Sequence, residues 1–201
     1  MSMSSDDEAR LEANALLLAV GNKDEALVRE MLDRGVHPDA VEDEKHPSGL
    51  RAVVHGDSAL WVALSRENVS SVAYLAIARI LVEHGADVDM AMGHDNRSMI
   101  RIAATNNLLN VAWLLIKAGA DLSVPTAQQD QTPLHLAALH GHWTITHLLI
   151  DHGAKLDLQN WQGETPLHIA SARGYVEIVS ALIAAGAMVD LYARSAGGRR
   201  R

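Results

Sequence analysis

Residues 132–154 read TPLHLAALHGHWTITHLLIDHGA, and residues 165–187 read TPLHIASARGYVEIVSALIAAGA. The two stretches follow one pattern, with the opening Thr132 and Thr165 separated by 33 residues, as are the closing Gly153 and Gly186. A sequence that repeats at this period is typical of a solenoid, in which each structural unit contacts only its neighbours.

Each of these units contains the signals for two short helices. Thr132 is a favourable N-cap, and Pro133 suits the first position of a helix. Gly141 ends this first helix, and a second helix follows with apolar residues at Ile145, Leu148 and Leu149. Gly153 then ends the second helix, as glycine commonly does just past a helix C-terminus. The pattern predicts a pair of helices followed by a turn.

The segments TPLHLAALHGH, HLLIDHGAKLD, GETPLHIASARGY and ALIAAGAMVD resemble the ankyrin repeat. This resemblance implies antiparallel helix pairs that are joined by projecting β-hairpin-like loops. We therefore expect an all-α ankyrin-repeat solenoid of about five repeats, which together form one domain over residues 1–201. The match is most specific at the C-terminal end and fades toward the N-terminus.

The glycines that close the repeats set their register. They stand at 35, 85, 119, 153 and 186, which predicts repeats at about 9–39, 54–89, 94–123, 128–157 and 161–190. SALWVALSREN and SMIRIAATNNL take the place of the TPLH helix in the second and third repeats. The longer spacing between Gly35 and Gly85 indicates two insertions. One is an enlarged loop at 40–53, and the other adds about six residues near Asn68–Tyr74, which lengthen either the second helix of the second repeat or the loop before it. Residues 191–201 form a tail.

Turn residues support this register. The expected tips of the loops before the second to fifth repeats are Gly56, Asn96, Asp130 and Gly163. Glycine, asparagine and aspartate are the residue types that most readily adopt a left-handed backbone. The same position therefore predicts a left-handed residue in each loop.

Composition excludes several classes of protein. The formal net charge of −8 disfavours nonspecific binding to nucleic acid, which needs a cationic surface. The absence of cysteine excludes disulfides and thiolate chemistry. The N-terminus is acidic where a secretory signal would be positively charged, and no apolar run is long enough to cross a bilayer. We expect a cytoplasmic monomer that does not bind a membrane.

No residues are predicted to be catalytic, to bind a cofactor or to bind a metal. The chain has no nucleophile elbow and no glycine loop that would hold phosphate. In the resemblance, His135 and His168 are structural, and the other histidines of the fourth repeat (140, 142, 147 and 152) do not converge as metal ligands must. Asp87, Asp121 and Asp190 recur near one repeat position, so we interpret them as turn residues.

The resemblance implies that loop tips and the exposed side of the first helices bind another protein. Trp161 is the most informative of these residues, because tryptophan is enriched at binding hot spots and is poorly placed on a loop tip to join the core; the alternative is that it folds back on its own hairpin. Trp61, Trp143 and Trp113 are interpreted as packing residues. The predicted partner-binding residues are His55, Asp57, Arg66, His94, Asp95, Arg97, Asn106, Gln128, Gln129, Gln131, His140, Trp161, Gln162, Glu164 and Arg173.

Two functions fit these expectations. The chain is predicted to be a non-catalytic protein-interaction module, such as a scaffold, with a preformed concave face. The alternative is a dedicated inhibitor or immunity protein that blocks a partner enzyme or toxin, with the 40–53 loop extending the face if it is ordered. The acidic residues near the N-terminus predict a polar cap, whereas Val179, Leu182 and Ile183 are expected to be only partly covered.

Overall fold

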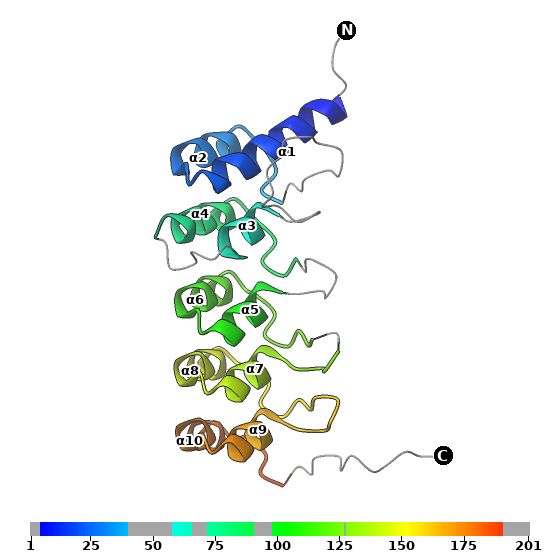
Figure 1. Ribbon diagram of the computed structural model, residues 1–201, viewed down its shortest axis with the longest axis vertical. Helices are drawn as coiled ribbons and strands as arrows, with labels where there is room; N and C mark the ends of the chain where they lie inside the picture. Colours follow the sequence, from blue (N-terminus) through cyan, green and yellow to red (C-terminus); the bar gives the residue numbers. More distant parts are fainter. Residues whose placement is uncertain (1–4, 40–57, 66–71, 91–97, 127, 191–201) are drawn as a thin grey trace, which may run out of the picture. The chain divides into compact units, whose positions relative to one another are not determined.

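The computed structural model describes residues 5–39, 58–65, 72–90, 98–126 and 128–190 (Figure 1). Within these residues the chain forms ten α-helices, and they pack as five pairs, α1 with α2, α3 with α4, and so on to α9 with α10. The chain divides into two compact units, Met1–His94 and Asp95–Arg201. The division falls where the third predicted repeat begins. The helices confirm the predicted all-α repeat architecture.

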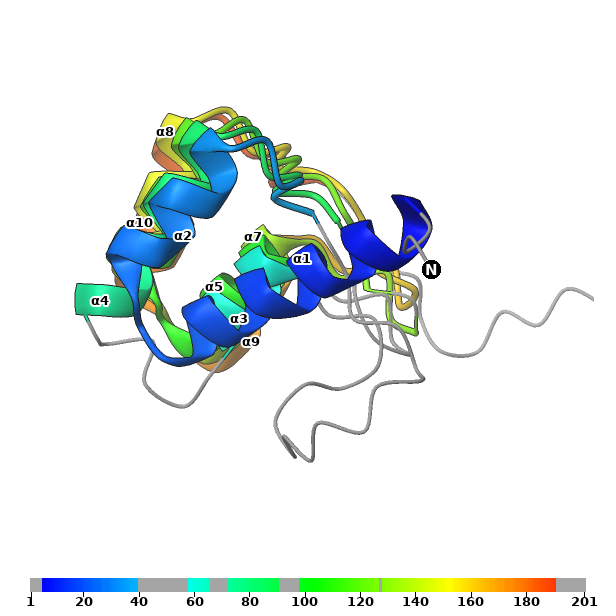
Figure 2. The ribbon, with the colours of Figure 1, turned by 90° about the horizontal axis from the view of Figure 1, so that it is seen from above.

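The N-terminal unit contains two helix pairs. The first pair is α1 (Ser5–Gly21) and α2 (Glu25–Asp33), and the second is α3 (Ala59–Ser65) and α4 (Val72–Glu83). The pairs stack with α1 against α3 and α2 against α4, as seen end-on in Figure 2. Each unit therefore has a row of first helices and a row of second helices.

The C-terminal unit repeats this arrangement three times. Its first helices are α5 (Met99–Asn106), α7 (Pro133–His140) and α9 (Pro166–Arg173). Its second helices are α6 (Leu109–Lys117), α8 (Trp143–Asp151) and α10 (Val176–Ala184). α7 packs against both α5 and α9, and α8 packs against both α6 and α10. Apolar side chains such as Leu134, Ile145 and Leu149 are fully buried in this stack.

The TPLH sequence forms a reciprocal cap at the start of α7 and of α9. The Thr132 side chain accepts a hydrogen bond from the backbone N–H of His135, and the His135 ring accepts one from the Thr132 N–H. Thr165 and His168 form the same pair in α9. Two backbone donors that the helix itself cannot satisfy are thereby bonded at each N-terminus.

The closing glycines have the positive backbone angles that are expected just past a helix C-terminus. Their φ values are +98°, +87°, +91°, +80° and +95° at residues 35, 85, 119, 153 and 186. At the predicted loop tips, Asp130 has φ 51° and Gly163 has φ 77°, whereas Gly56 and Asn96 lie outside the described residues. A left-handed glycine follows the second helix of each of the five helix pairs, as the pattern predicts.

Aspartates at the turns also follow the predicted role. Asp87 and Asp121 each accept a hydrogen bond from the backbone N–H two residues further on. Asp39 accepts a bond from the N–H of Asp87 at 2.9 Å, and Asp157 accepts one from the N–H of Met188 at 2.8 Å. The last two bonds connect neighbouring repeats at equivalent positions, so the turns contribute directly to stacking.

The third repeat keeps its helix without the TPLH residues. Ser98 occupies the N-cap position of α5 but makes no side-chain capping bond. Arg101 stands where His135 stands in the next repeat, is 6% exposed, and donates from its guanidinium to the Pro125 carbonyl at 2.7 Å. Asn107 ends the helix with φ 57°, in place of glycine. The larger, cationic side chain of Arg101 therefore takes over the contact with the following loop.

The two predicted irregularities fall near the N-terminus. α4 has 12 residues where α2, α6, α8 and α10 have 9 each, so part of the added length extends the second helix. The rest of that region, and the whole 40–53 loop, lie outside the described residues. α1 begins at Ser5, earlier than the predicted start of the first repeat, and its residues Glu8, Arg10 and Glu12 are exposed.

One expectation about the last repeat is wrong. Leu182 is fully buried, because α10 packs against both α8 and α9. Ile183, the next residue, is 48% exposed and points out of that packing.

Candidate binding surface

Two loops of the C-terminal unit are held in defined conformations by their own hydrogen bonds. In the loop before α7, the Thr126 N–H donates to the Gln131 carbonyl at 2.8 Å, and the Asp130 N–H donates to the Thr126 carbonyl at 3.1 Å. The Thr126 hydroxyl also accepts from the N–H groups of Gln129 and Gln131. This tip is therefore closed by bonds from both sides.

The loop before α9 is organised around a buried asparagine. Asn160 is 5% exposed, and its side-chain oxygen accepts from the N–H groups of Gln162 and Glu164. Its amide nitrogen donates to the Glu164 carboxylate at 3.1 Å, and its backbone N–H donates to the Glu164 carbonyl at 2.9 Å. One side chain thus fixes the path of the tip that carries Trp161.

The two loop tips are joined to each other. The Trp161 N–H donates to the Gln129 carbonyl at 3.2 Å. The Trp161 side chain is nevertheless 58% exposed, more than any other tryptophan in the described residues. The backbone of Trp161 is fixed while its ring remains accessible to solvent.

The ends of the first helices carry a second group of exposed polar residues. Asn106, His140 and Arg173 are the last residues of α5, α7 and α9, and all three are exposed. The His140 ring stacks on that of His142, with 5.7 Å between ring centroids. Burial lowers the pKa of His140, and the neighbouring His142 and Arg173 lower it further. His140, His142 and Arg173 form a cluster of basic residue types, which we call the His140 cluster.

The structure places only some of the predicted partner-binding residues. Asn106, Gln128, Gln129, His140, Gln162 and Arg173 are exposed, along with Trp161. Gln131 is 8% exposed and Glu164 is partly buried and bonded to Asn160, so both offer less surface than expected. The remaining predicted residues lie outside the described part of the chain: His55, Asp57, Arg66, His94, Asp95 and Arg97.

The histidine of each TPLH sequence has a structural role. His135 is fully buried, and its Nε2 donates to the Glu164 carbonyl of the following repeat at 3.0 Å. His142 similarly links repeats, with its Nε2 donating to the Thr105 carbonyl at 2.9 Å. Of the histidines in the fourth repeat, these two connect neighbouring helix pairs.

The interpretation of two tryptophans as packing residues is wrong. Trp113 is 47% exposed and Trp143 is 49% exposed. α6 buries Val111, Leu114 and Leu115 against its neighbours, so Trp113 lies on the opposite side of the helix, where the Lys117 ammonium is 5.9 Å from its ring. Trp143 begins α8 and contacts the His147 ring at 4.7 Å between centroids. The second helices therefore expose large aromatic rings that were predicted from the sequence to be packing residues.

Three further features of the described residues concern possible metal sites, pockets and membrane spans. No group of three or more metal-binding side chains occurs among them. A groove of about 260 Å³ between α2 and α4 is lined by apolar residues together with Glu25, Arg29, Arg79 and Glu83, and its lining contains no Ser, His or Cys. Among the described helices, none combines the length and apolar character that a bilayer crossing would need.

The helix pairs, their left-handed closing turns and the bonds between neighbouring pairs define a tandem-repeat protein of the helical solenoid class. The family model for ankyrin repeats (3 copies) matches residues 16–126 and 100–193, and the chain belongs to the ankyrin-repeat family. No curated protein matches the chain. Ankyrin repeats are generally protein–protein interaction modules and are typically non-catalytic.

Proposed function

We propose that this protein binds another protein through the loop tips and first-helix ends of its C-terminal unit. The observation that carries the proposal is Trp161, whose ring is 58% exposed on a loop tip fixed by backbone and side-chain hydrogen bonds. An aromatic ring that is already held in place loses little conformational freedom on binding, so more of its contact energy contributes to affinity. Tryptophan is also among the residues most enriched at binding hot spots.

The surroundings of Trp161 favour a partner with an apolar group beside acidic ones. Gln129 and Gln162 are exposed on the two joined tips, and their side chains can donate or accept hydrogen bonds. Arg173, at the end of α9, supplies an exposed positive charge in a chain whose formal net charge is −8. A carboxylate of the partner would complement this local positive charge and help to set the orientation of the complex.

The proposal is tested by comparing two exposed tryptophans of the same unit. A partner captured from the native source by the intact chain is purified, and its affinity is measured for the wild type, Trp161→Ala and Trp143→Ala. We expect Trp161→Ala to weaken binding by about 2 kcal/mol or more, and Trp143→Ala, on a second helix, to leave it unchanged. Circular dichroism and urea unfolding establish that both variants are folded.

Unchanged affinity in Trp161→Ala would refute the proposed surface. A loss confined to Trp143→Ala would place binding on the second helices instead. An activity assay on the captured partner, with and without this protein, separates a scaffold from an inhibitor, since only an inhibitor abolishes the partner's activity.

The proposed working form is a monomer in the cytoplasm. A chain without cysteine functions unchanged in a reducing compartment, and the net negative charge favours solubility. Light scattering of the purified chain tests the first point, because a mass twice the 21.7 kDa of one chain would exclude it. Fractionation of native cells tests the second.

A further inference from the structure

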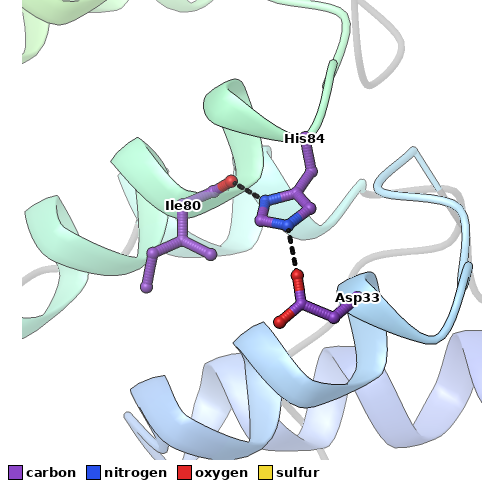
Figure 3. Close-up of polar contacts among 3 residues, drawn as sticks. All are labelled: Asp33, Ile80 and His84. Atoms are coloured by element: carbon purple, nitrogen blue, oxygen red, sulfur yellow. Dashed lines mark hydrogen bonds and ion pairs between the residues drawn. The ribbon is translucent and has the colours of Figure 1, made fainter.

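A histidine and an aspartate connect the first two helix pairs (Figure 3). His84 directly follows α4, and its Nε2 lies 3.1 Å from a carboxylate oxygen of Asp33, the last residue of α2. The other ring nitrogen, Nδ1, lies 2.8 Å from the backbone carbonyl oxygen of Ile80. The imidazole is thus placed between an atom of its own helix and one of the neighbouring repeat.

Both partners of the His84 ring are hydrogen-bond acceptors. A carbonyl oxygen can only accept, and an ionised carboxylate can only accept. A neutral imidazole has one N–H, so it can satisfy only one of these partners and turns a lone pair toward the other. The doubly protonated imidazolium donates to both at once. The geometry therefore fits the charged form of His84.

The charged groups around His84 are few among the described residues. α2 places Asp33 near the ring and Arg29 somewhat further away, and the charge of Arg29 opposes that of the imidazolium. α3, which also packs against α4, has the sequence ALWVALS and contains no ionisable side chain. On its own helix, Glu83 precedes His84. Asp33 is thus the group from the neighbouring repeat that favours the charged imidazole.

The fourth repeat provides an internal comparison. His152 directly follows α8, as His84 follows α4, and its Nδ1 lies 2.9 Å from the Leu148 carbonyl oxygen. The residue equivalent to Asp33, at the end of the preceding second helix, is Lys117. The same histidine position is therefore paired with an acidic position in the N-terminal unit and a basic one in the C-terminal unit.

We propose that His84 and Asp33 form a proton-dependent clamp between the first and second helix pairs. The clamp is closed while His84 carries both ring protons and weakens when it loses one. The His84 side chain is 23% exposed and that of Asp33 is 64% exposed, so solvent protons reach the pair directly. The exposure also keeps the effect moderate, as for other ion pairs near a surface.

The sign of the pH dependence follows from the partners. The bond to the Ile80 carbonyl and the bond to Asp33 raise the pKa of His84 above its ordinary value, against opposing effects of burial and Arg29. A histidine with a raised pKa in the folded state stabilises that state fully below its unfolded pKa of about 6.5. This contribution disappears as the pH rises through the higher pKa of the folded state. The joint between α2 and α4 should therefore loosen toward alkaline pH.

Native-state hydrogen exchange tests the clamp in the full chain. Opening constants for amides of α2 and α4 are compared at pH 5.5 and 8.0, after correction for intrinsic exchange. In the wild type they should rise about two- to fivefold with pH. In His84→Gln this rise should be absent, and in Asp33→Asn it should be smaller, because the bond to Ile80 remains. The difference between wild type and His84→Gln removes the contribution of other titrating groups.

Two further variants exploit the fourth repeat. His152→Gln is a matched control and should leave the response of α2 and α4 unchanged. Lys117→Asp places a carboxylate before His152 and should give the α6–α8 joint a new component that loosens with rising pH. An equal response of α2 and α4 in wild type and His84→Gln would overturn the proposal. If Lys117→Asp gives the α6–α8 joint no such component, an acid at this position together with the histidine is not enough to form a clamp, and the proposed basis of the clamp is overturned.

Nuclear magnetic resonance gives a direct reading of the proton. Asp33→Asn should lower the pKa of His84, because the bond to an ionised carboxylate is lost while the bond to Ile80 remains. An unchanged titration of His84 in this variant would show that the pair does not control its charge, and the clamp would be rejected even if the exchange data followed the expected pattern.

Discussion

The histidines of the two TPLH sequences should contribute very different free energies of unfolding. His135 and His168 make the same reciprocal bonds with Thr132 and Thr165. His135, however, is fully buried and donates through Nε2 to the carbonyl of Glu164 in the next repeat, whereas His168 is partly exposed. Within the described residues His168 makes no corresponding bond to another repeat. Comparing His135→Ala with His168→Ala thus measures what the bond to the next repeat and the burial of His135 contribute beyond the cap.

The magnitude follows from the bonds that each change removes. Loss of the ring bond to the N-cap should cost about 1 kcal/mol in both variants. His135→Ala also loses the Nε2 bond, another 1 kcal/mol or so, and leaves a cavity at a fully buried position that costs about 1–2 kcal/mol more. The Glu164 carbonyl keeps its bond from the Asn160 N–H, so it is not left without a donor. We expect about 3–4 kcal/mol for His135→Ala and about 1 kcal/mol for His168→Ala.

Urea unfolding at pH 7.5, followed by tryptophan fluorescence, measures both values. Three of the four tryptophans (113, 143 and 161) lie in the C-terminal unit, so the signal reports mainly on the unit that contains the mutations. Equal losses in the two variants would refute the reasoning, because they would show that the bond to Glu164 and the burial of His135 contribute nothing beyond the cap.

Three other changes test local features of the C-terminal unit. Gly153→Ala should lower the free energy of unfolding by about 1–2 kcal/mol through its φ of +80° alone, since no atom lies within 4 Å of the added carbon. Gly141→Ala should lower it further, because the added carbon would lie 2.8 Å from the Tyr175 ring. Thermal unfolding of the two variants measures the difference. In urea unfolding, Thr132→Ala should lower the free energy of unfolding by about 1–2 kcal/mol, because a helix cap is lost. Ser98→Ala should change it very little, because the buried Ser98 hydroxyl has no hydrogen-bond partner in the described residues. Burial holds the pKa of His135 below its ordinary value. The urea midpoint of the C-terminal unit should therefore fall as the pH drops below about 6.5, where the histidine of the unfolded chain takes up a proton. In His135→Gln the midpoint should depend less on pH.

Local sequence signals predicted the features that depend on one or two neighbouring residues. The Thr-Pro start of α7 and the left-handed closing glycines follow from backbone chemistry within a few residues, and both were predicted. The same logic located α5, although its sequence SMIRIAATNNL lacks the capping threonine and histidine. The left-handed loop tips at Asp130 and Gly163 were also predicted, because the residue there must tolerate a positive φ.

Features that depend on packing between repeats were harder to predict. α6 has the sequence LNVAWLLIK, which is apolar almost throughout, so its pattern does not reveal which side faces the core. The exposure of Trp113 is decided by the neighbouring helices, and tertiary packing of this kind overrides composition. The contact between Asp33 and His84 joins residues 51 positions apart, across the irregular spacing of the first two repeats, so no regular period indicated it. A comparison of the residues that end successive second helices could have done so.

His84 and His135 show how the identity of the partner atoms decides the charge of a histidine. The Nδ1 of His135 receives hydrogen bonds from Thr132, so it must keep a lone pair, and the buried ring is neutral. His84 faces two acceptors, so its ring fits best with two protons. Acidification should therefore strengthen the joint between α2 and α4 while it weakens the α7 capping site, and alkaline conditions should do the reverse. Since both histidines connect neighbouring repeats, pH should change which joint of the chain opens most readily, even where the total free energy of unfolding changes little.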